Sequence, residues 1–264
     1  MHPDPQWAAA VHAAVTVGNR VAQVRPSRAL DGPERLIAQH EADMMAHRGL
    51  HEALTTAYPG CPVVSEEDLR HDERRPSAYW LIDPIDGTAS WSAGFPGFVC
   101  QLALVVDDTV RFGALHAPVL ERTWTCASGD GAYLNGVRMG DRHPRVADED
   151  LVVVDNYPEP RGVARDLMDW LGTDHYLECG SIGLKAALVA SGEADVFVKD
   201  VVVRDWDIAP ALALLAEVSG DLRRGDGQPY ELTGAYEKAE GVLVTRDAAL
   251  GDRVGEWLGR RLAR

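Results

Sequence analysis

The sequence predicts a layered fold of the α/β or α+β class, with helices packed on mixed and antiparallel sheets. Two stretches with apolar residues at helical spacing open the chain, and short apolar strands separated by tight turns follow them. Beyond residue 150, strands and helices alternate to the end of the sequence. Helices and strands mixed in this way, with antiparallel hairpins among them, indicate a layered architecture.

The first half is expected to hold two helices and then a run of antiparallel strands. Pro59-Gly60 ends the second helical pattern, while Asp107-Asp108 and Asn135-Gly136 are typical of tight turns between strands. The expected elements, in order, are helices over residues 5–24 and 34–60, strands over 61–68 and 78–87, a strand pair over 98–118 and further antiparallel strands over 122–139.

A polar, turn-rich segment, "GDRHPRVADED" at residues 140–150, predicts a boundary between two halves. We expect an N-terminal α+β half over residues 1–145 and a C-terminal α/β half over residues 146–264. Pro210 falls in the helical pattern that begins at Trp206, where a proline is tolerated within a first turn. The elements expected in this half are a strand at 151–156, a helix at 161–171, a helix from 180 to 192 with a strand after it, a helix at 206–220, a strand at 240–247 and a helix at 251–264.

Composition and charge exclude several kinds of partner. The 264 residues carry a net charge of −15, which argues against nucleic-acid polymers and membrane surfaces as partners. The four cysteines lie far apart without metal-ligand spacing, as expected for reduced thiols in a cytoplasmic protein. No secretory signal peptide and no apolar run of membrane-spanning length is expected.

Three acidic groups stand at the ends of apolar segments: the tripeptide at residues 66–68, the pair Asp83 and Asp86, and the pair Asp205 and Asp207. Carboxylates in partly buried settings need a compensating partner. Oxygen ligands without histidine or cysteine suit Mg²⁺ or Mn²⁺ better than zinc. The carbonyl of Ile85, between two of the aspartates, is a further oxygen donor, so these groups predict a site for a hard cation.

Gly87 and Thr88 follow the second acidic group directly. If a helix starts there, its free backbone N–H groups favour a phosphate beside the metal. Taken singly, each feature also has a structural explanation, because Asp before Gly is ordinary turn chemistry and Asp205 and Asp207 could cap a helix. Their occurrence together favours a phosphoryl-transfer site.

Four segments carry a resemblance to a known family. They are "YPGCPVVSEE", "WLIDPIDGTASWSAGFPGFVCQLALV", "GSIGLKAALVASGEADVFV" and "VRDWDIAPALALLAEVSG", in that order along the chain. Together they resemble the inositol monophosphatase family of magnesium-dependent, lithium-sensitive sugar and nucleotide phosphatases. The resemblance implies an αβαβα sandwich, a homodimer and a small phosphorylated metabolite as substrate.

The resemblance also implies roles for matching residues. Glu66, Asp83 and the Ile85 carbonyl would bind one Mg²⁺, and Asp83, Asp86 and Asp207 a second, with a third, weaker ion near Glu66. Mn²⁺ could replace Mg²⁺, whereas Ca²⁺ or Li⁺ would inhibit. Asp86, Gly87 and Thr88 would bind the phosphate, and Asp43 would orient or activate the attacking water with Thr88 or Glu66. Glu67 would support the metal ligands. Gly180, Ser181 and either Lys199 or Asp200 would bind the rest of the substrate.

This chain departs from the family pattern at three places. His40 stands where a threonine is usual before Asp43, and Pro210 interrupts a small-residue run. At the position of a substrate-binding glutamate the chain has Lys199, or Asp200 if an insertion lies earlier. Lys199 would favour a substrate with a second anionic group, and Asp200 would favour hydroxyls or an amine; an exposed pair without a role is the structural alternative.

The function expected from the sequence is Mg²⁺-dependent hydrolysis of a small phosphomonoester by a metal-activated water. Inositol phosphate is the default substrate. The alternatives are a 3′(2′),5′-bisphosphate nucleotide, a nucleoside monophosphate, and histidinol or sugar phosphates of a specialised pathway. A non-catalytic ligand-binding descendant is less favoured because Glu66, Asp83, Asp86, Thr88 and Asp207 are all retained. A structural Ca²⁺ module is disfavoured by the Gly-Thr dipeptide.

Overall fold

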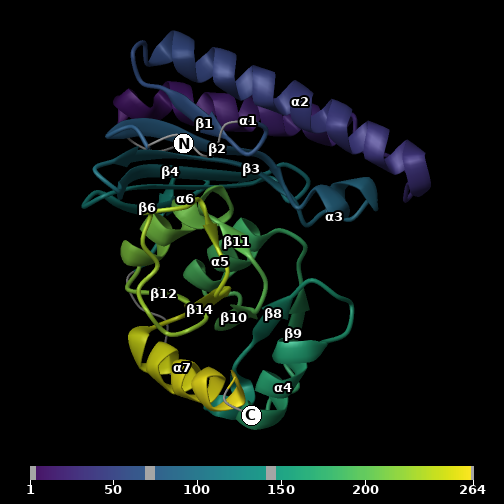
Figure 1. Ribbon diagram of the computed structural model, residues 1–264, viewed down its shortest axis with the longest axis vertical. Coiled ribbons are helices and arrows are strands. Elements are labelled where there is room, and N and C mark those ends of the chain that lie inside the picture. Colours follow the sequence, from purple (N-terminus) through teal and green to yellow (C-terminus); the bar gives the residue numbers. More distant parts are fainter. Residues whose placement is uncertain (1–3, 69–74, 141–146, 263–264) are drawn as a thin grey trace.

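The computed structural model describes residues 4–68, 75–140 and 147–262, and its layers follow one another from top to bottom in Figure 1. Helices cover both sheets on the outside, and two further helices lie between the sheets. This arrangement confirms the αβαβα sandwich. The outer helices are α1 (Ala8–Gln23), α2 (Gly32–Ala57), α4 (Gly162–Leu171) and α7 (Ala248–Leu262), and the central ones are α5 (Ile182–Ala190) and α6 (Asp205–Ala216).

The first sheet has seven strands in sequence order, β1 to β7. Strands β1 and β2 pair in parallel, and every later neighbour is antiparallel. The predicted turns are confirmed, since Asp107, Asp108 and Asn135 all have positive φ. The strands are β1 (Val63–Ser65), β2 (Ala78–Asp86), β3 (Val99–Val106), β4 (Thr109–Ala117), β5 (Arg122–Ala127), β6 (Gly131–Leu134) and β7 (Val137–Arg138).

The second sheet has the strand order β12-β14-β10-β8-β9. Strands β8, β9 and β10 run parallel, so their carboxyl ends meet at one edge. The strands are β8 (Val153–Asp155), β9 (Tyr176–Glu178), β10 (Val196–Lys199), β12 (Asp221–Arg224) and β14 (Val242–Thr245), and a separate pair is formed by β11 (Val203–Arg204) and β13 (Glu237–Lys238). Sequence patterns missed four of these strands, β9, β11, β12 and β13, because two to four mostly polar residues carry no readable alternation.

The two halves of the chain share one core. Helices α5 and α6, from the second half, pack against strands of the first sheet. One hydrophobic cluster accordingly joins Tyr79 and Leu115 to Phe197 and Val244. The division into residues 1–145 and 146–264 falls between the two sheets and stays a prediction, and residues 141–146 beside it lie outside the described part of the chain.

Helix α6 begins one residue earlier than the sequence pattern indicated. It starts at Asp205, so Pro210 is its sixth residue and lies beyond the first turn, contrary to the prediction. A proline there cannot donate the N–H bond to the carbonyl four residues earlier, on Trp206. Gly113 of β4 allows the close packing of this proline, because a Cβ at Gly113 would lie 3.0 Å from Pro210 Cα.

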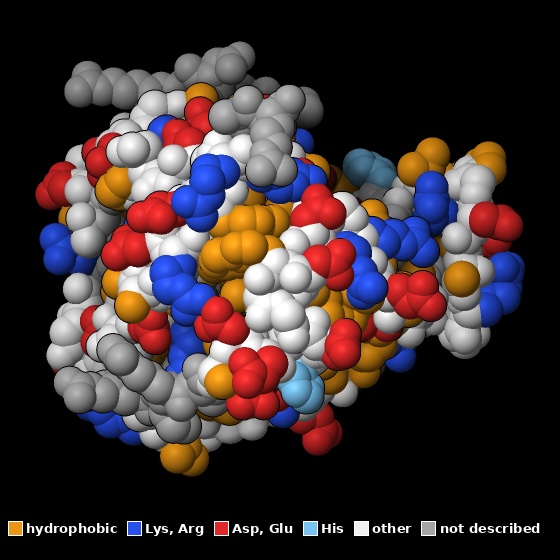
Figure 2. Space-filling view, turned by 90° about the horizontal axis from the view of Figure 1, so that it is seen from below, with side chains coloured by type: hydrophobic (Ala, Val, Ile, Leu, Met, Phe, Trp, Pro, Cys, Tyr) orange, Lys and Arg blue, Asp and Glu red, His pale blue; other side chains and the backbone are white. Residues whose placement is uncertain are grey.

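The outer face formed by α4 and α7 mixes charges of both signs, and Figure 2 shows this face from below. Arg261 pairs with Asp166 at 3.0 Å, and the rings of Trp170 and Trp257 stack with centroids 5.7 Å apart. Within the described residues, no helix has both the length and the hydrophobicity that crossing a membrane requires.

Candidate active site

The first carboxylates are brought together by the parallel pairing of β1 with β2. Ser65 pairs with Ile82, and the Glu66 N–H donates to the Ile82 carbonyl at 3.3 Å. Glu66 therefore lies beside Asp83, which is 1% exposed. The strand register shifts between Asp83 and Asp86, and the Ile85 N–H donates to Asp83 Oδ1 at 3.1 Å. This local turn keeps both aspartates at the buried end of β2.

Asp207 comes from the second half of the chain. It lies in the first turn of α6 and is 8% exposed, and its Oδ2 accepts a hydrogen bond from the Arg204 N–H at 2.8 Å. The side-chain amide of Gln101 on β3 joins it to the other aspartates. Gln101 Nε2 donates to Asp86 Oδ2 at 3.3 Å and to the carbonyls of Trp206 and Asp207 at 2.9 and 3.1 Å.

Burial concentrates negative charge at this site. It raises the pKa of Asp83 well above its usual value, and the charges of Glu66, Asp86 and Asp207 raise it further. The pKa of Asp207 is also well above normal through burial and the charge of Asp86. Burial likewise raises the pKa values of Glu66 and Asp86. Burial raises the pKa of all four carboxyl groups, and like charges add to the rise at Glu66, Asp83 and Asp207, so the cluster needs either protons or a cation.

Asp43 joins this cluster from the middle of α2. Its pKa is raised to about 8, chiefly by burial and then by the charges of Glu67 and Glu66. The structure therefore brings helix α2 and the end of β1 to the same place, as the sequence-based role for Asp43 requires.

The segment after the aspartates makes a sharp turn into the short helix α3 (Thr88–Ser92). Gly87 adopts φ +93°, which favours glycine, and a Cβ there would lie 3.0 Å from the Gly97 carbonyl oxygen. Thr88 Oγ1 donates to the Ile85 carbonyl at 2.9 Å. The hydroxyl and the carbonyl expected to contact phosphate and metal thus bond to each other in this structure.

Ser181 supports Asp86 from the start of α5. The Ser181 hydroxyl donates to Asp86 Oδ2 at 2.5 Å and accepts the Leu184 N–H at 2.9 Å, while the Gly183 N–H donates to Asp86 Oδ2 at 2.7 Å. Ser181 is fully buried. A Cβ at Gly180 would lie 1.8 Å from Ser90 Oγ, so this glycine permits packing between segments. These contacts give Ser181 and Gly180 structural uses, and their roles in substrate binding stay predictions.

Lys199 and Asp200 point to different partners. Lys199, at the end of β10, places its Nζ 2.9 Å from Asp155 Oδ1, and Asp200 pairs with Arg261 at 3.7 Å. Lys185 interacts electrostatically with both Asp86 and Lys199. Which of Lys199 and Asp200 faces the substrate stays a prediction.

Lys185 itself was missed by the sequence analysis. It is fully buried in α5, donates to the Gly180 carbonyl at 3.0 Å and lies 4.8 Å from the centroid of the Phe197 ring. Burial lowers its pKa to about 8. The sequence signal for a buried Lys185 was a single lysine in the apolar run "GLKAALVA". The corresponding signal for Gln101 was a single glutamine in the apolar run "FVCQLALV".

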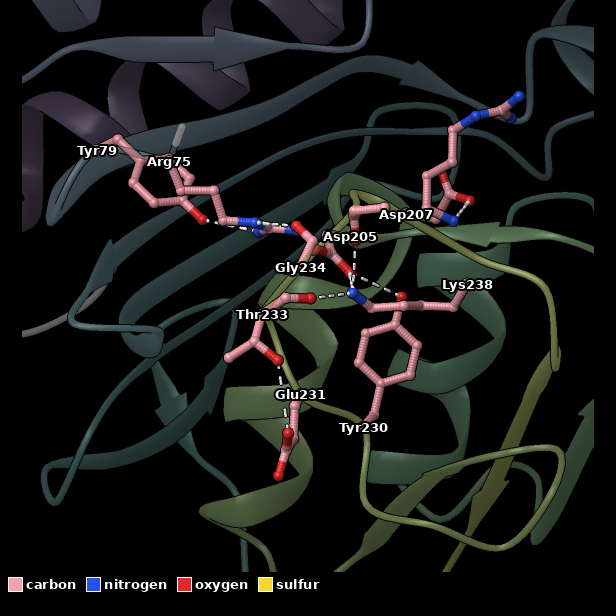
Figure 3. Close-up of polar contacts among 11 residues, drawn as sticks. Arg75, Tyr79, Asp205, Asp207, Tyr230, Glu231, Thr233, Gly234 and Lys238 are labelled. Atoms are coloured by element: carbon pink, nitrogen blue, oxygen red, sulfur yellow. Dashed lines mark hydrogen bonds and ion pairs between the residues drawn. The ribbon is translucent and has the colours of Figure 1, made fainter. Parts of the chain in front are cut away.

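A second polar network surrounds the first residue of α6 and is drawn in Figure 3. The buried Asp205 pairs with Arg75, accepts the Tyr230 hydroxyl at 3.1 Å and lies 3.7 Å from Lys238 Nζ. Arg75 also donates to the Gly234 carbonyl at 2.9 Å. This network fixes the first residue of α6, two positions before Asp207.

The donor set fits a hard cation by its chemistry, because it consists of carboxylate and carbonyl oxygens. The charge of Arg204 opposes the rise in the pKa values of Glu66 and Asp207, and the charge of Lys185 opposes the rise in the pKa of Asp86. Within the part of the chain that the structure describes, no three acidic, histidine or cysteine side chains converge closely enough to enclose an ion. The oxygens of Asp86 and Asp207 instead accept protein hydrogen bonds, so binding an ion would reorient some of these side chains.

Comparison with known proteins decides the family. The sequence model of the inositol monophosphatase family matches residues 3–256. The chain belongs to this family. Membership confirms the resemblance and, with relatives named as phosphatases, the expected enzyme class of phosphoric monoester hydrolase.

Curated relatives of this family member have different activities in their names. It is 33% identical over 213 residues to the 3′(2′),5′-bisphosphate nucleotidase CysQ of Aggregatibacter actinomycetemcomitans, covering 77% of this chain and 76% of the relative. It is 32% identical over 180 residues to the fructose-1,6-bisphosphatase/inositol-1-monophosphatase of Thermotoga maritima, covering 68% of each. Among solved structures, the Thermotoga maritima IMPase TM1415 has a TM-score of 0.79 at 23% identity, with 96% of both chains covered, which supports the same fold.

Proposed function

We propose that this family member hydrolyses a small phosphomonoester in a Mg²⁺-dependent reaction at the cluster around Asp83. The observation that carries the proposal is the convergence of acidic residues from four elements, with pKa values raised by burial and by one another. Such an excess of buried negative charge is compensated most directly by cations.

The acidic residues and one carbonyl would provide the oxygen ligands for the metal ions. Glu66, Asp83 and the Ile85 carbonyl would hold one Mg²⁺, and Asp83, Asp86 and Asp207 would hold a second, with a weaker third expected near Glu66. When bound, Mg²⁺ supplies charge that stabilises the transition state and lowers the pKa of the attacking water.

The chain's own groups orient the reactants. Gly87 and Thr88 bind the phosphate through backbone N–H groups and the Thr88 hydroxyl, which must leave the Ile85 carbonyl to do so. Asp43 accepts a hydrogen bond from the attacking water and holds it in line, helped by Glu66 or Thr88. Glu67 raises the pKa of Asp43 and supports the metal ligands from behind.

A 3′(2′),5′-bisphosphate nucleotide is the second candidate substrate. It is favoured by Lys199, whose positive charge suits a substrate with a second anionic group, and by the similarity to a relative of that name. Asp155 neutralises part of the Lys199 charge. Inositol phosphate remains the default because a single phosphate suffices for the metal ligands proposed here.

Further properties belong to the same proposal. We expect Mn²⁺ to replace Mg²⁺, Ca²⁺ and Li⁺ to inhibit, the enzyme to be cytoplasmic, and two copies to form a homodimer. Light scattering after size exclusion would measure the mass, and a value near 28.7 kDa would contradict the dimer.

Phosphate release from a substrate panel tests the proposal. The panel holds inositol 1-phosphate, 3′-phosphoadenosine 5′-phosphate, AMP, histidinol phosphate and fructose 1,6-bisphosphate, each with Mg²⁺ and with EDTA. Release that requires Mg²⁺ and is lost in Asp83→Asn would support it. Thr125→Val is the control, because Thr125 is a buried residue of β5 outside the cluster. Release that persists in EDTA would contradict the metal requirement.

A further inference from the structure

Gln101 occupies a position that no sequence motif marked. It lies on β3, is fully buried, and its Nε2 faces three oxygen atoms: Asp86 Oδ2 and the carbonyls of Trp206 and Asp207. Because all three are acceptors, the nitrogen end of the amide must face them. One side chain therefore contacts both aspartates proposed to share the second Mg²⁺, one from β2 and one from α6.

The contact with Trp206 compensates for a defect in α6. A helical residue normally donates its N–H to the carbonyl four residues earlier, but Pro210 has no N–H to give to Trp206. Gln101 Nε2 supplies a donor to that carbonyl at 2.9 Å. The third contact, at 3.1 Å, is to the carbonyl of Asp207 itself. A side chain of β3 thus supplies the hydrogen bond to the first turn of α6 that the helix backbone lacks.

The opposite end of the amide fits against α5. Gln101 Oε1 has no hydrogen-bond partner within the described residues, and a Cβ at Gly183 would lie 2.2 Å from it. Glycine at 183 therefore leaves room for this side chain. The Gly183 N–H donates to Asp86 Oδ2, so Gly183 and Gln101 hold the same carboxylate oxygen. Glycine is required here for these contacts.

We propose that Gln101 is a positioning residue that replaces the N–H missing at Pro210 and so fixes the Asp207 carboxylate relative to Asp86. The inference rests on the proposed function, in which these two aspartates share an ion. A neutral amide suits the task, because it donates hydrogen bonds without adding a positive charge that would compete with the cation. A lysine or arginine here would neutralise the ligands it positions.

The test measures metal binding directly. Mn²⁺ is titrated into metal-free protein, and the free ion is followed by electron paramagnetic resonance. Gln101→Met keeps the length of the side chain and removes its donors. We expect Mn²⁺ affinity to fall about 10- to 100-fold, the range seen when groups that orient metal ligands are lost. Thr125→Val, which removes a buried hydroxyl from the same sheet, should leave the affinity unchanged.

Two further variants keep the test decisive. If Gln101→Met does not fold, Gln101→Asn retains the amide but cannot reach all three acceptors, and it should weaken Mn²⁺ binding in the same direction. Pro210→Ala restores a backbone donor for Trp206, so the double variant Gln101→Met/Pro210→Ala should recover part of the lost affinity. A double variant no better than Gln101→Met would overturn the link to Pro210.

The failure of this inference is distinguishable from failure of the proposed function. Wild-type protein that binds Mn²⁺ and releases phosphate, together with a folded Gln101→Met or Gln101→Asn variant of unchanged affinity, would overturn the inference alone. Wild-type protein that neither binds Mn²⁺ nor releases phosphate from any panel substrate would overturn both.

Discussion

Asp83 is the residue at which the opposing demands of stability and function are clearest. It is buried and surrounded by Glu66, Asp86 and Asp207, each of which raises its pKa. Without metal these like charges disfavour the folded state, because the unfolded chain separates them in water. A residue placed so unfavourably for folding is explained by the cation that it would bind.

The first prediction separates these two effects. Asp83→Asn should lower Mg²⁺-dependent phosphate release by roughly a hundredfold or more, the scale of losing a group that stabilises the transition state. The same variant should be at least as stable as the wild type in EDTA, because it removes one of the repelling charges. Urea denaturation in EDTA measures the free energy of unfolding. A variant with near-normal turnover would show that Asp83 is not a metal ligand.

The second prediction concerns pH and Asp43. Its pKa in the folded protein is about 8, above its ordinary value of 3.8, so between these values the folded state holds a proton that the unfolded chain has released. The stability contribution of this group is complete below 3.8 and is lost as pH rises through about 8. Metal-free protein should therefore become less stable between about pH 5 and pH 8.

Asp43→Asn provides the comparison for this pH profile. The variant cannot release a proton at this position, so its urea midpoint should change less over the same pH range. Both proteins are measured in EDTA at matched ionic strength. Equal slopes for wild type and variant would show that Asp43 does not carry the effect.

At the scale of elements, two sets of contacts hold the start of α6. Gln101 on β3 donates to the carbonyls of Trp206 and Asp207. The network of Arg75, Tyr230 and Lys238 binds Asp205 (Figure 3). Burial raises the pKa of Asp205, and the positive charge of Arg75 opposes this shift. Asp207 therefore lies in a first helical turn in which Asp205 and the Trp206 carbonyl are both held by other elements.

The third prediction follows from the buried pair. Asp205→Asn leaves Arg75 and Lys238 with positive charge and no buried counter-charge, so it should cost about 3–5 kcal/mol in the free energy of unfolding. Glu256→Gln is the control, since Glu256 pairs with Arg260 on the surface and both side chains are more than half exposed. That change should cost less than about 1 kcal/mol. A loss below about 1 kcal/mol for Asp205→Asn would show that the network adds little to stability.

Comparison of the sequence predictions with these elements shows where sequence patterns carry information. Strand β2 and its terminal aspartates were predictable because a long apolar run ends in acids and a turn. Gln101 was not, because its role depends on Pro210, which is more than 100 positions away in the sequence. Pro210 was expected within the first turn for a related reason: the donor that makes an interior proline tolerable comes from another strand. Lys185 was missed because its partners come from several elements.

At the scale of the whole molecule, the layers explain how distant segments form one site. The two central helices carry Ser181 and Asp207 into the space between the sheets, where the ends of β1 and β2 bring Glu66 and Asp83. The site therefore exists only when both halves are folded. A ligand that binds it stabilises the complete fold and not one half alone.

The fourth prediction uses this coupling. Mg²⁺ at about 100 times its dissociation constant should stabilise the folded protein by about 2.7 kcal/mol. For a protein of this size that corresponds to a rise of about 5 °C or more in Tm.

Mg²⁺ also screens the net charge of −15, which alone would favour the compact state. Sodium chloride at matched ionic strength separates the two causes, because screening acts on every charge while site binding needs Asp83. We therefore expect a Tm rise with Mg²⁺ that exceeds the rise with salt in the wild type, and no such excess in Asp83→Asn. Equal shifts with Mg²⁺ and with salt in the wild type would mean that the acidic cluster binds no ion under these conditions.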